Sequence, residues 1–178
     1  LSNGASAGFP RVWDIALETI AHGDGRVDLV GLTRFIAAYE SVSPLNLGEL
    51  WAIPIMLRLA LIENLRRVAL RIAAGRIDRD LASQWVRAMI TTVDQDPKSL
   101  ILVVADMARS KPPMSAPFVS EFVRGLQGQS PALVLALTWV EQRLAEDGLS
   151  TELLVQSGNQ IQAADQVTIG NSIGSLRF

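Results

Sequence analysis

A chain of 178 residues, of which 49% are hydrophobic and 19% charged, is long enough for one sizeable core and too apolar to be disordered. Its formal net charge of −2, without any block of Lys or Arg, argues against binding nucleic acid through phosphate neutralisation. The sequence has no cysteine, which excludes disulfides and thiolate chemistry, and its single histidine, His22, argues against a histidine-based metal site or catalytic pair.

The first nine residues are small and mostly polar, and they lack the charged and apolar regions of a signal peptide. We therefore expect residues 1–9 to be a flexible amino-terminal segment, or residues added to the natural chain. We expect residues 10–178 to form a single helical domain that is a fragment of a larger, cytoplasmic chain.

The first half of the chain is predicted to be helical. In residues 10–22, four apolar residues recur at helical intervals, and Gly23 suits the end of that helix: Val12, Ile15, Ala16 and Ile20. Asp28 can cap a second helix, 29–41, in which five residues share a face: Leu29, Leu32, Phe35, Ile36 and Tyr39. Asn46 and Glu49 form a capping box that opens a long helix, which we expect to end at Gly75.

The second half is also predicted to be helical. Asp78 can cap a further helix in which Leu81, Trp85, Ala88 and Met89 face inward, and Asp96 followed by Pro97 begins the next. After a proline-rich connector, Phe118, Phe122 and Leu126 form an apolar stripe. Ser130 and Pro131 open another helix, and Ser150 opens a long final one that can reach the end of the chain. The sequence therefore predicts an all-α, multi-helix bundle of about eight helices with a long final helix.

The stretch "GELWAIPIMLRLALIENLRRVALRIAAGR", residues 48–76, is unusually apolar for a surface helix. Its apolar run is broken by Arg58 and is too short to cross a bilayer, so it predicts a core helix and no transmembrane span. Arg58 falls on the face of Trp51 and Ile62, where a buried guanidinium would cost several kcal/mol unless paired. One interpretation is a structural salt bridge with a carboxylate of another helix, for which the candidates are Asp106, Glu121, Glu141 and Asp165. The other is that Arg58 contacts an anion or a sugar in a pocket.

The final helix has apolar residues around most of its circumference and three interior glycines, Gly158, Gly170 and Gly174. Each glycine costs up to about 1 kcal/mol in a helix interior, but small residues allow close packing. We therefore expect this helix to pack against partners outside the fragment.

Short motifs with catalytic associations have simpler structural explanations. "DQD", residues 94–96, resembles a metal-binding pair, but Asp96 precedes Pro97 as a helix cap should. "HGDGRVD", residues 22–28, reads as a polar turn, and "GNSIGS" lacks the strand that precedes a phosphate loop. Tyr39 is either a core residue or a functional hydroxyl. No catalytic residue, metal ligand or cofactor is predicted.

Three segments together resemble one protein family: "PRVWDIALETIAHGDGRVD", "AAYESVSPLNLGELWAIPIMLRLALIENLRRVALRIA" and "NQIQAADQVTIGNSIGSLR". They are similar to the amino-terminal cytoplasmic region of bacterial cyclic β-1,2-glucan synthases. The block "LWAIPIMLRLALIENLRR" is long enough to be specific, whereas residues 82–149 carry less of the likeness. Gly23 and Gly174 depart from the pattern, which leads us to expect threonine at both positions.

The resemblance implies a very large inner-membrane protein that polymerises and cyclises glucose from UDP-glucose, with this region on the cytoplasmic side and before the glucosyltransferase module. The favoured hypothesis is a non-catalytic scaffold that docks other domains of the synthase and exposes an apolar patch when isolated. The alternative is a module that holds the nascent β-1,2-glucan, with Arg58 and Trp51 as contacts and Tyr39 as a contact or attachment point. A free-standing enzyme is least favoured, because no acid–base groups converge.

Overall fold

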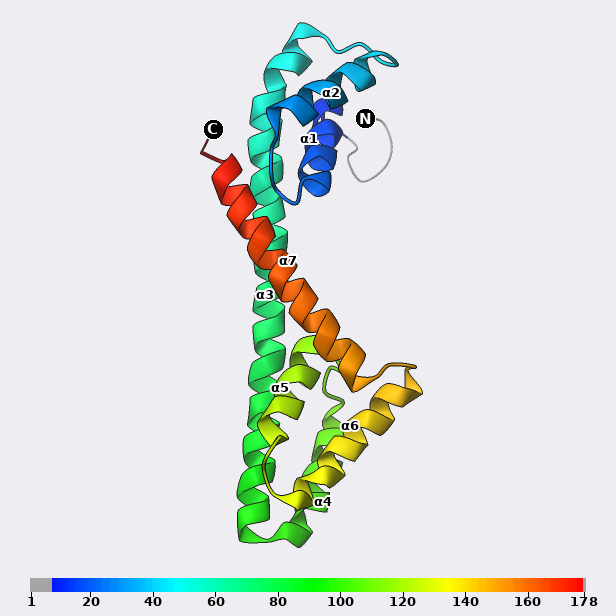
Figure 1. Cartoon of the computed structure of the whole chain (residues 1–178), viewed down its shortest axis with the longest axis vertical. Coiled ribbons are helices and arrows are strands. Elements are labelled where there is room, and N and C mark those ends of the chain that lie inside the picture. The colour runs from blue at the N-terminus through cyan, green and yellow to red at the C-terminus, as the bar shows by residue number, and fades with distance from the viewer. Residues whose placement is uncertain (1–7, 178) are drawn as a thin grey trace. The chain divides into compact units, whose positions relative to one another are not determined.

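The computed structural model describes residues 8–177, and within that range all the regular secondary structure is helical, with no strand (Figure 1). The helices are α1 (Arg11–His22), α2 (Leu29–Glu40), α3 (Leu47–Gln95), η1 (Pro97–Ser99), α4 (Leu100–Ser110), α5 (Ala116–Leu126), η2 (Pro131–Leu133), α6 (Val134–Glu146) and α7 (Thr151–Ser175), where η marks a 3₁₀ helix. The predicted all-α class is confirmed, and so is the long final helix.

The described residues form seven α-helices because two of the predicted helices are one. Gly75 does not end a helix, and Asp78 does not cap one; both lie inside the 49-residue α3. Gly75 is buried against α5, where an added Cβ would lie 3.3 Å from Pro117 Cγ. Asp78 accepts a 2.6 Å hydrogen bond from Ser115 Oγ. Both residues therefore join α3 to the start of α5.

Contacts divide the chain into two compact units. Unit 1 extends to Leu70 and resumes at Ala163, and unit 2 comprises Arg71–Gln162. The expectation for residues 1–9 falls mostly outside the described residues, although Phe9 stacks on Trp13 with ring centroids 5.4 Å apart. The expectation that residues 10–178 form a single domain stays a prediction, which the cooperativity of unfolding would test.

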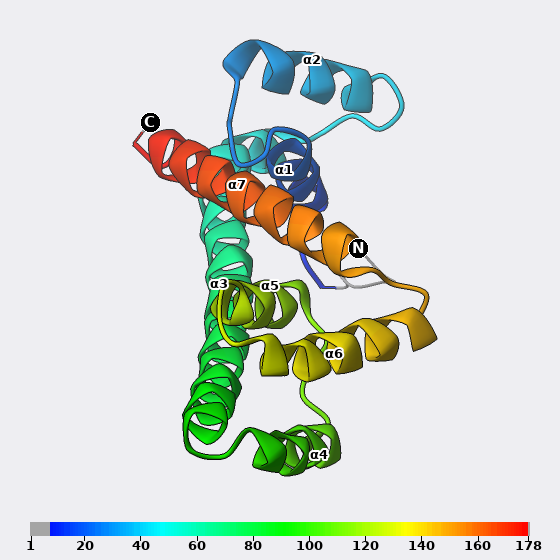
Figure 2. The same ribbon diagram turned by 60° about the horizontal axis from the view of Figure 1, so that its bottom comes forward.

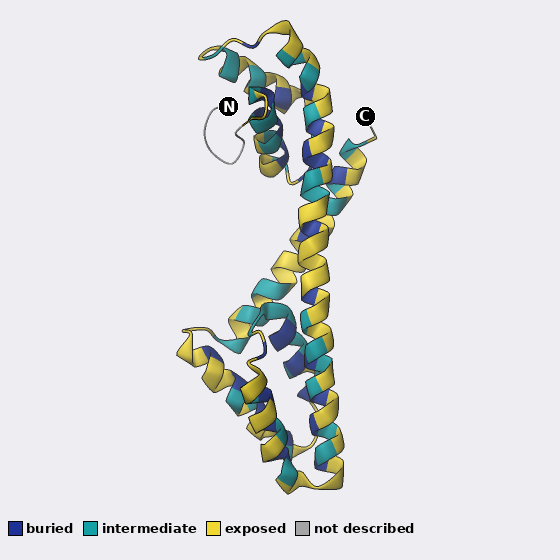
Figure 3. Ribbon diagram, turned by 180° about the vertical axis from the view of Figure 1, so that it is seen from behind, coloured by how far each residue is buried: buried dark blue, intermediate teal, exposed yellow. Residues whose placement is uncertain are grey.

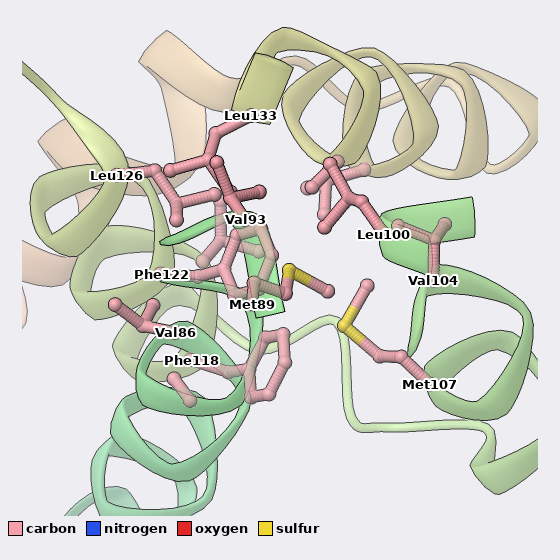
Figure 4. Packing of buried hydrophobic residues seen from close by; sticks show 14 of the residues in the cluster. Val86, Met89, Val93, Leu100, Val104, Met107, Phe118, Phe122, Leu126 and Leu133 are labelled. Atoms are coloured by element: carbon pink, nitrogen blue, oxygen red, sulfur yellow. The ribbon is translucent and has the colours of Figure 1, made fainter. Parts of the chain in front are cut away.

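Unit 2 is built around a cluster of large, fully buried side chains from α3, α4, α5 and α6 (Figure 4). Phe118 and Phe122 stack with centroids 5.8 Å apart, and Met89 and Met107 fill the space beside them. The predicted stripe of α5 is confirmed, because Leu126 is also buried. Helix α6 contacts both α4 and α5, so three short helices enclose this core against α3 (Figure 2).

Local signals in unit 2 mostly behaved as predicted. The Asp96 carboxylate accepts hydrogen bonds from Ser99 Oγ at 2.6 Å and Lys98 N at 3.1 Å, which confirms the cap and lowers the pKa of Asp96. Ala88, predicted to face inward, is exposed. Gly158 packs closely within unit 2, since an added Cβ would lie 3.4 Å from the Ala116 Cβ. The predicted packing of α7 against partners outside the fragment stays a prediction.

Unit 1 packs α1 against the amino-terminal half of α3, and all four predicted core residues of α1 are buried. The Asp28 cap is confirmed by a 2.8 Å hydrogen bond from Gly31 N. In α2, however, only Leu32 is buried, while Leu29 is 74% and Phe35 38% exposed. The five residues predicted to share a face of α2 are therefore covered unequally, because α2 covers the core with a narrower face than its sequence offers.

Candidate functional site

The most unusual surface of unit 1 is a row of large, exposed apolar side chains of α3, which we call the α3 stripe. Figure 3 shows that exposed and buried residues alternate along this helix. The members of the stripe are between 47% and 75% exposed: Leu47, Trp51, Ile55, Leu59 and Ile62. They recur at helical spacing and form a continuous row over about four turns. The opposite side of the helix is buried, with Ile53, Leu57 and Leu61 in the core. One face of this apolar helix is therefore uncovered in unit 1.

Arg58 lies on the uncovered side of α3, and the prediction that it is buried with Trp51 and Ile62 is wrong. The core of unit 1 covers only one side of this part of α3, and Arg58 lies on the exposed side. The prediction that residues 48–76 form a core helix therefore holds only for the side of α3 that carries Ile53, Leu57 and Leu61.

The four candidate carboxylates for the predicted Arg58 salt bridge lie in both units: Asp106, Glu121 and Glu141 in unit 2, and Asp165 in unit 1. Asp106 pairs with Arg109 in unit 2, and Glu121 pairs there with Arg124 at 2.6 Å, which lowers the pKa of Glu121. Asp165 is buried in unit 1, the unit that contains Arg58. The Arg58 salt bridge stays a prediction.

Tyr39 belongs to a different environment from Trp51 and Arg58, because it is partly buried against the core of unit 1. Beside it, the Arg11 guanidinium donates to Glu49 through Nε at 2.9 Å and Nη2 at 2.7 Å, and also to Ser43 Oγ. The hydrogen bond from Arg11 holds the pKa of Glu49 below its usual value, and the Glu49 carboxylate in turn raises the pKa of Arg11. The three sugar-contact candidates therefore do not form one site.

The turn between α1 and α2 is fastened to the end of α7 by hydrogen bonds across most of the chain. Val27 N donates to Ser175 Oγ at 3.0 Å over a separation of 148 residues. Asn171 Nδ2 donates to the Asp24 carbonyl at 3.2 Å over 147 residues. Asn64 of α3 adds a longer contact, from Nδ2 to Ser172 Oγ at 3.4 Å. The "HGDGRVD" turn, the "ENLRR" part of α3 and "GNSIGS" thus meet in one junction.

Gly25 allows this junction to close. Its φ is +81°, in the left-handed region that favours glycine, and an added Cβ would lie 2.2 Å from Ser172 Oγ. Both residues are buried. Gly23 has a separate constraint: an added Cβ would lie 2.3 Å from the Arg26 carbonyl oxygen, whereas Gly174 has nothing within 4 Å. The threonine expected at 174 would therefore fit, but the one expected at 23 would require this turn to change.

A cavity of about 490 Å³ opens beside the same turn, between the end of α1 and the start of α2. Its polar lining comes from Glu18, His22, Arg26 and Asp28, and its apolar lining from Leu32 and Phe35. His22 Nδ1 lies 2.9 Å from the Glu18 carbonyl oxygen and 3.4 Å from its carboxylate. The sequence predicted the polar turn but not the cavity, because the cavity depends on how α2 crosses the end of α1. The one hint of this cavity is Phe35, a large apolar residue that lines it and remains exposed.

The predicted resemblance to cyclic β-1,2-glucan synthases is confirmed by sequence comparison. Over 170 residues, 95% of this chain, the sequence is 29% identical to the cyclic beta-(1,2)-glucan synthase NdvB of Rhizobium meliloti (strain 1021). The matched part is 6% of the length of that relative. No family model matches the chain. None of the described helices combines the length and the apolar character that crossing a membrane requires.

Proposed function

We propose that this chain is a non-catalytic helical scaffold of a cyclic β-1,2-glucan synthase, and that its α3 stripe docks another region of the same protein, such as the glucosyltransferase module. The similarity to a glucan synthase along 95% of the chain supports the setting. The exposed stripe is the observation that carries the docking role. In such a synthase the module would act on the cytoplasmic side of the bacterial inner membrane.

Covering the apolar surface of the stripe would contribute to the docking of a partner. Fully burying one such side chain stabilises a complex by roughly 1.5–3 kcal/mol. Since five side chains are each about half exposed, covering them offers on the order of 5 kcal/mol before the cost of association. The occupant we infer is another part of the synthase, because the matched relative extends far beyond the 6% aligned with this chain.

A photo-crosslinking amino acid at Trp51 of the full-length synthase tests this proposal. The matched control places the same group at Val42, which is 87% exposed but lies outside the stripe. We expect position 51 to crosslink to a peptide of the synthase from outside this region, and position 42 not to. Crosslinks from position 51 only to lipid, to a second copy of this region or to an unrelated protein would overturn the proposal.

Handling of the nascent glucan is the second candidate function, and the 75% exposure of Trp51 favours it. An exposed indole face can stack on a sugar ring, and Arg58 on the same side of α3 can donate hydrogen bonds to hydroxyls. Tyr39 as the attachment point of the glucan is a further proposal. Mass spectrometry of the synthase tests it directly, since a Tyr39 peptide free of hexose during active synthesis would refute the attachment.

A further inference from the structure

We propose that the cavity between α1 and α2 binds a glucose unit of a β-1,2-glucan chain. This inference deepens the second candidate function by assigning it a site, and it rests on the relation to a glucan synthase. In this inference the residues that contact the sugar are Glu18, Arg26 and Phe35, which line the cavity, in place of Trp51 and Arg58.

The size of the cavity suits a small ligand, and the charge of its lining disfavours an anion. Its volume of about 490 Å³ lies within the roughly 300–1,000 Å³ of small-molecule pockets. The lining carries two carboxylates, Glu18 and Asp28, against one guanidinium, Arg26, together with His22. This balance repels the diphosphate of a nucleotide sugar. In residues 8–177 no group of three or more His, Cys, Asp or Glu side chains is arranged to hold a metal ion.

The side chains around the opening combine apolar and polar groups, as a sugar ring does. Phe35 and Leu32 give an apolar wall for the C–H face of a pyranose, and Phe35 is accessible because it is 38% exposed. Arg26 offers planar N–H donors to hydroxyl oxygens, while the Glu18 carboxylate accepts from hydroxyl hydrogens. Hydroxyl groups need donors and acceptors together, and the opening provides both beside an apolar surface.

The wall of the cavity is held in place before any ligand arrives. The Asp28 carboxylate is fixed by the hydrogen bond from Gly31 N at 2.8 Å. The turn that carries Arg26 is fastened to α7 through Asp24 and Val27 on either side of it. A preorganised wall loses little conformational entropy on binding, which favours a weak but specific interaction with an uncharged ligand.

Calorimetric and NMR titrations of the 178-residue chain with linear β-1,2-gluco-oligosaccharides test the site. We expect saturable binding, with the amide signals of the 22–28 turn and of Phe35 moving most, and little response to UDP-glucose. Phe35→Ala and Arg26→Ala should each weaken binding about tenfold. Their matched controls are Val30→Ala and Arg34→Ala, exposed residues of α2 outside the lining, which should bind as the native chain does.

Three results would overturn the site. They are absence of saturable binding by the native chain, unchanged affinity in both lining variants, and UDP-glucose binding as tightly as the oligosaccharide. Binding that Trp51→Ala abolishes and Phe35→Ala leaves intact would keep the glucan-handling function and remove this site. The scaffold proposal is judged separately, because its crosslinking test at Trp51 requires no sugar.

Discussion

Replacing Gly25 with alanine tests whether the α1–α2 turn is locked against α7. The new Cβ would lie 2.2 Å from Ser172 Oγ and 2.9 Å from the Thr168 carbonyl oxygen, distances at which the packing must shift. The φ of +81° adds a second penalty, because an L-residue in the left-handed region costs roughly 1–2 kcal/mol. Overpacking a tight interior typically costs about 1–3 kcal/mol. We therefore expect Gly25→Ala to lower the free energy of unfolding of unit 1 by about 2–5 kcal/mol.

Gly128→Ala is the matched control for the backbone term. Gly128 has a φ of +73°, but nothing lies within 4 Å of its added Cβ. Its substitution should therefore cost only the roughly 1–2 kcal/mol of the left-handed conformation. The excess in Gly25→Ala measures the contact with α7.

A double-mutant cycle identifies the contacting atom. Ser172→Ala removes the Oγ at 2.2 Å and leaves the Ser172 Cβ position at 3.3 Å, so Gly25→Ala should cost less in that background. Urea denaturation followed by circular dichroism gives the global free energies. Amide exchange of Val27, whose N–H bonds to Ser175, reports the local opening and should speed up in Gly25→Ala but not in Gly128→Ala. Equal costs for the two glycine variants, with no coupling to Ser172, would refute the close packing of this turn on α7.

Three further predictions address the core, the stripe and an ion pair. Phe122→Ala should lower the free energy of unfolding in urea by about 3–5 kcal/mol, since it empties the fully buried centre of unit 2. Trp51→Ser should change it by no more than about 0.5 kcal/mol, because the indole is 75% exposed, and a loss several times larger would show that the stripe is covered. The hydrogen bond from Arg11 lowers the pKa of Glu49 in the folded state, so its contribution is present above the unfolded pKa and lost as pH falls through the folded one. Glu49→Gln should accordingly flatten the acid side of the thermal-stability profile, and an unchanged profile would show that this pair does not contribute.

The helix starts were the most predictable part of the fold, because each is decided by a few neighbouring residues. Asp28, Asp96 and the Asn46–Glu49 box all make the predicted backbone bonds. The end predicted at Gly75 was wrong because glycine serves two purposes, stopping a helix or admitting a close neighbour. The neighbour of Gly75 is Pro117, which is distant in sequence, so the residues around Gly75 cannot show which of the two purposes it serves.

The exposed faces were the least predictable part. Periodicity identifies which residues of a helix are apolar, but the neighbouring elements decide which of them are covered. Trp51 and Ile62 therefore pointed to a core face that proved to be a surface. The junction at Gly25 was equally hidden, because its partner Ser172 lies in a segment that is distant in sequence and reads as a separate motif.

The division into two units has a consequence for how the protein is made. Unit 2 is one uninterrupted stretch, Arg71–Gln162, inserted into unit 1, whose two pieces flank it. On a ribosome, unit 2 can collapse as soon as its own residues emerge, whereas unit 1 must wait for Asn171, Ser172 and Ser175. Until then the turn at Asp24–Val27 lacks its hydrogen bonds to Asn171 and Ser175 of α7, so the amino-terminal helices are not yet held together by that helix. Translation that stops after Gln162, at the end of unit 2, should leave an open amino-terminal half that chaperones and proteases recognise.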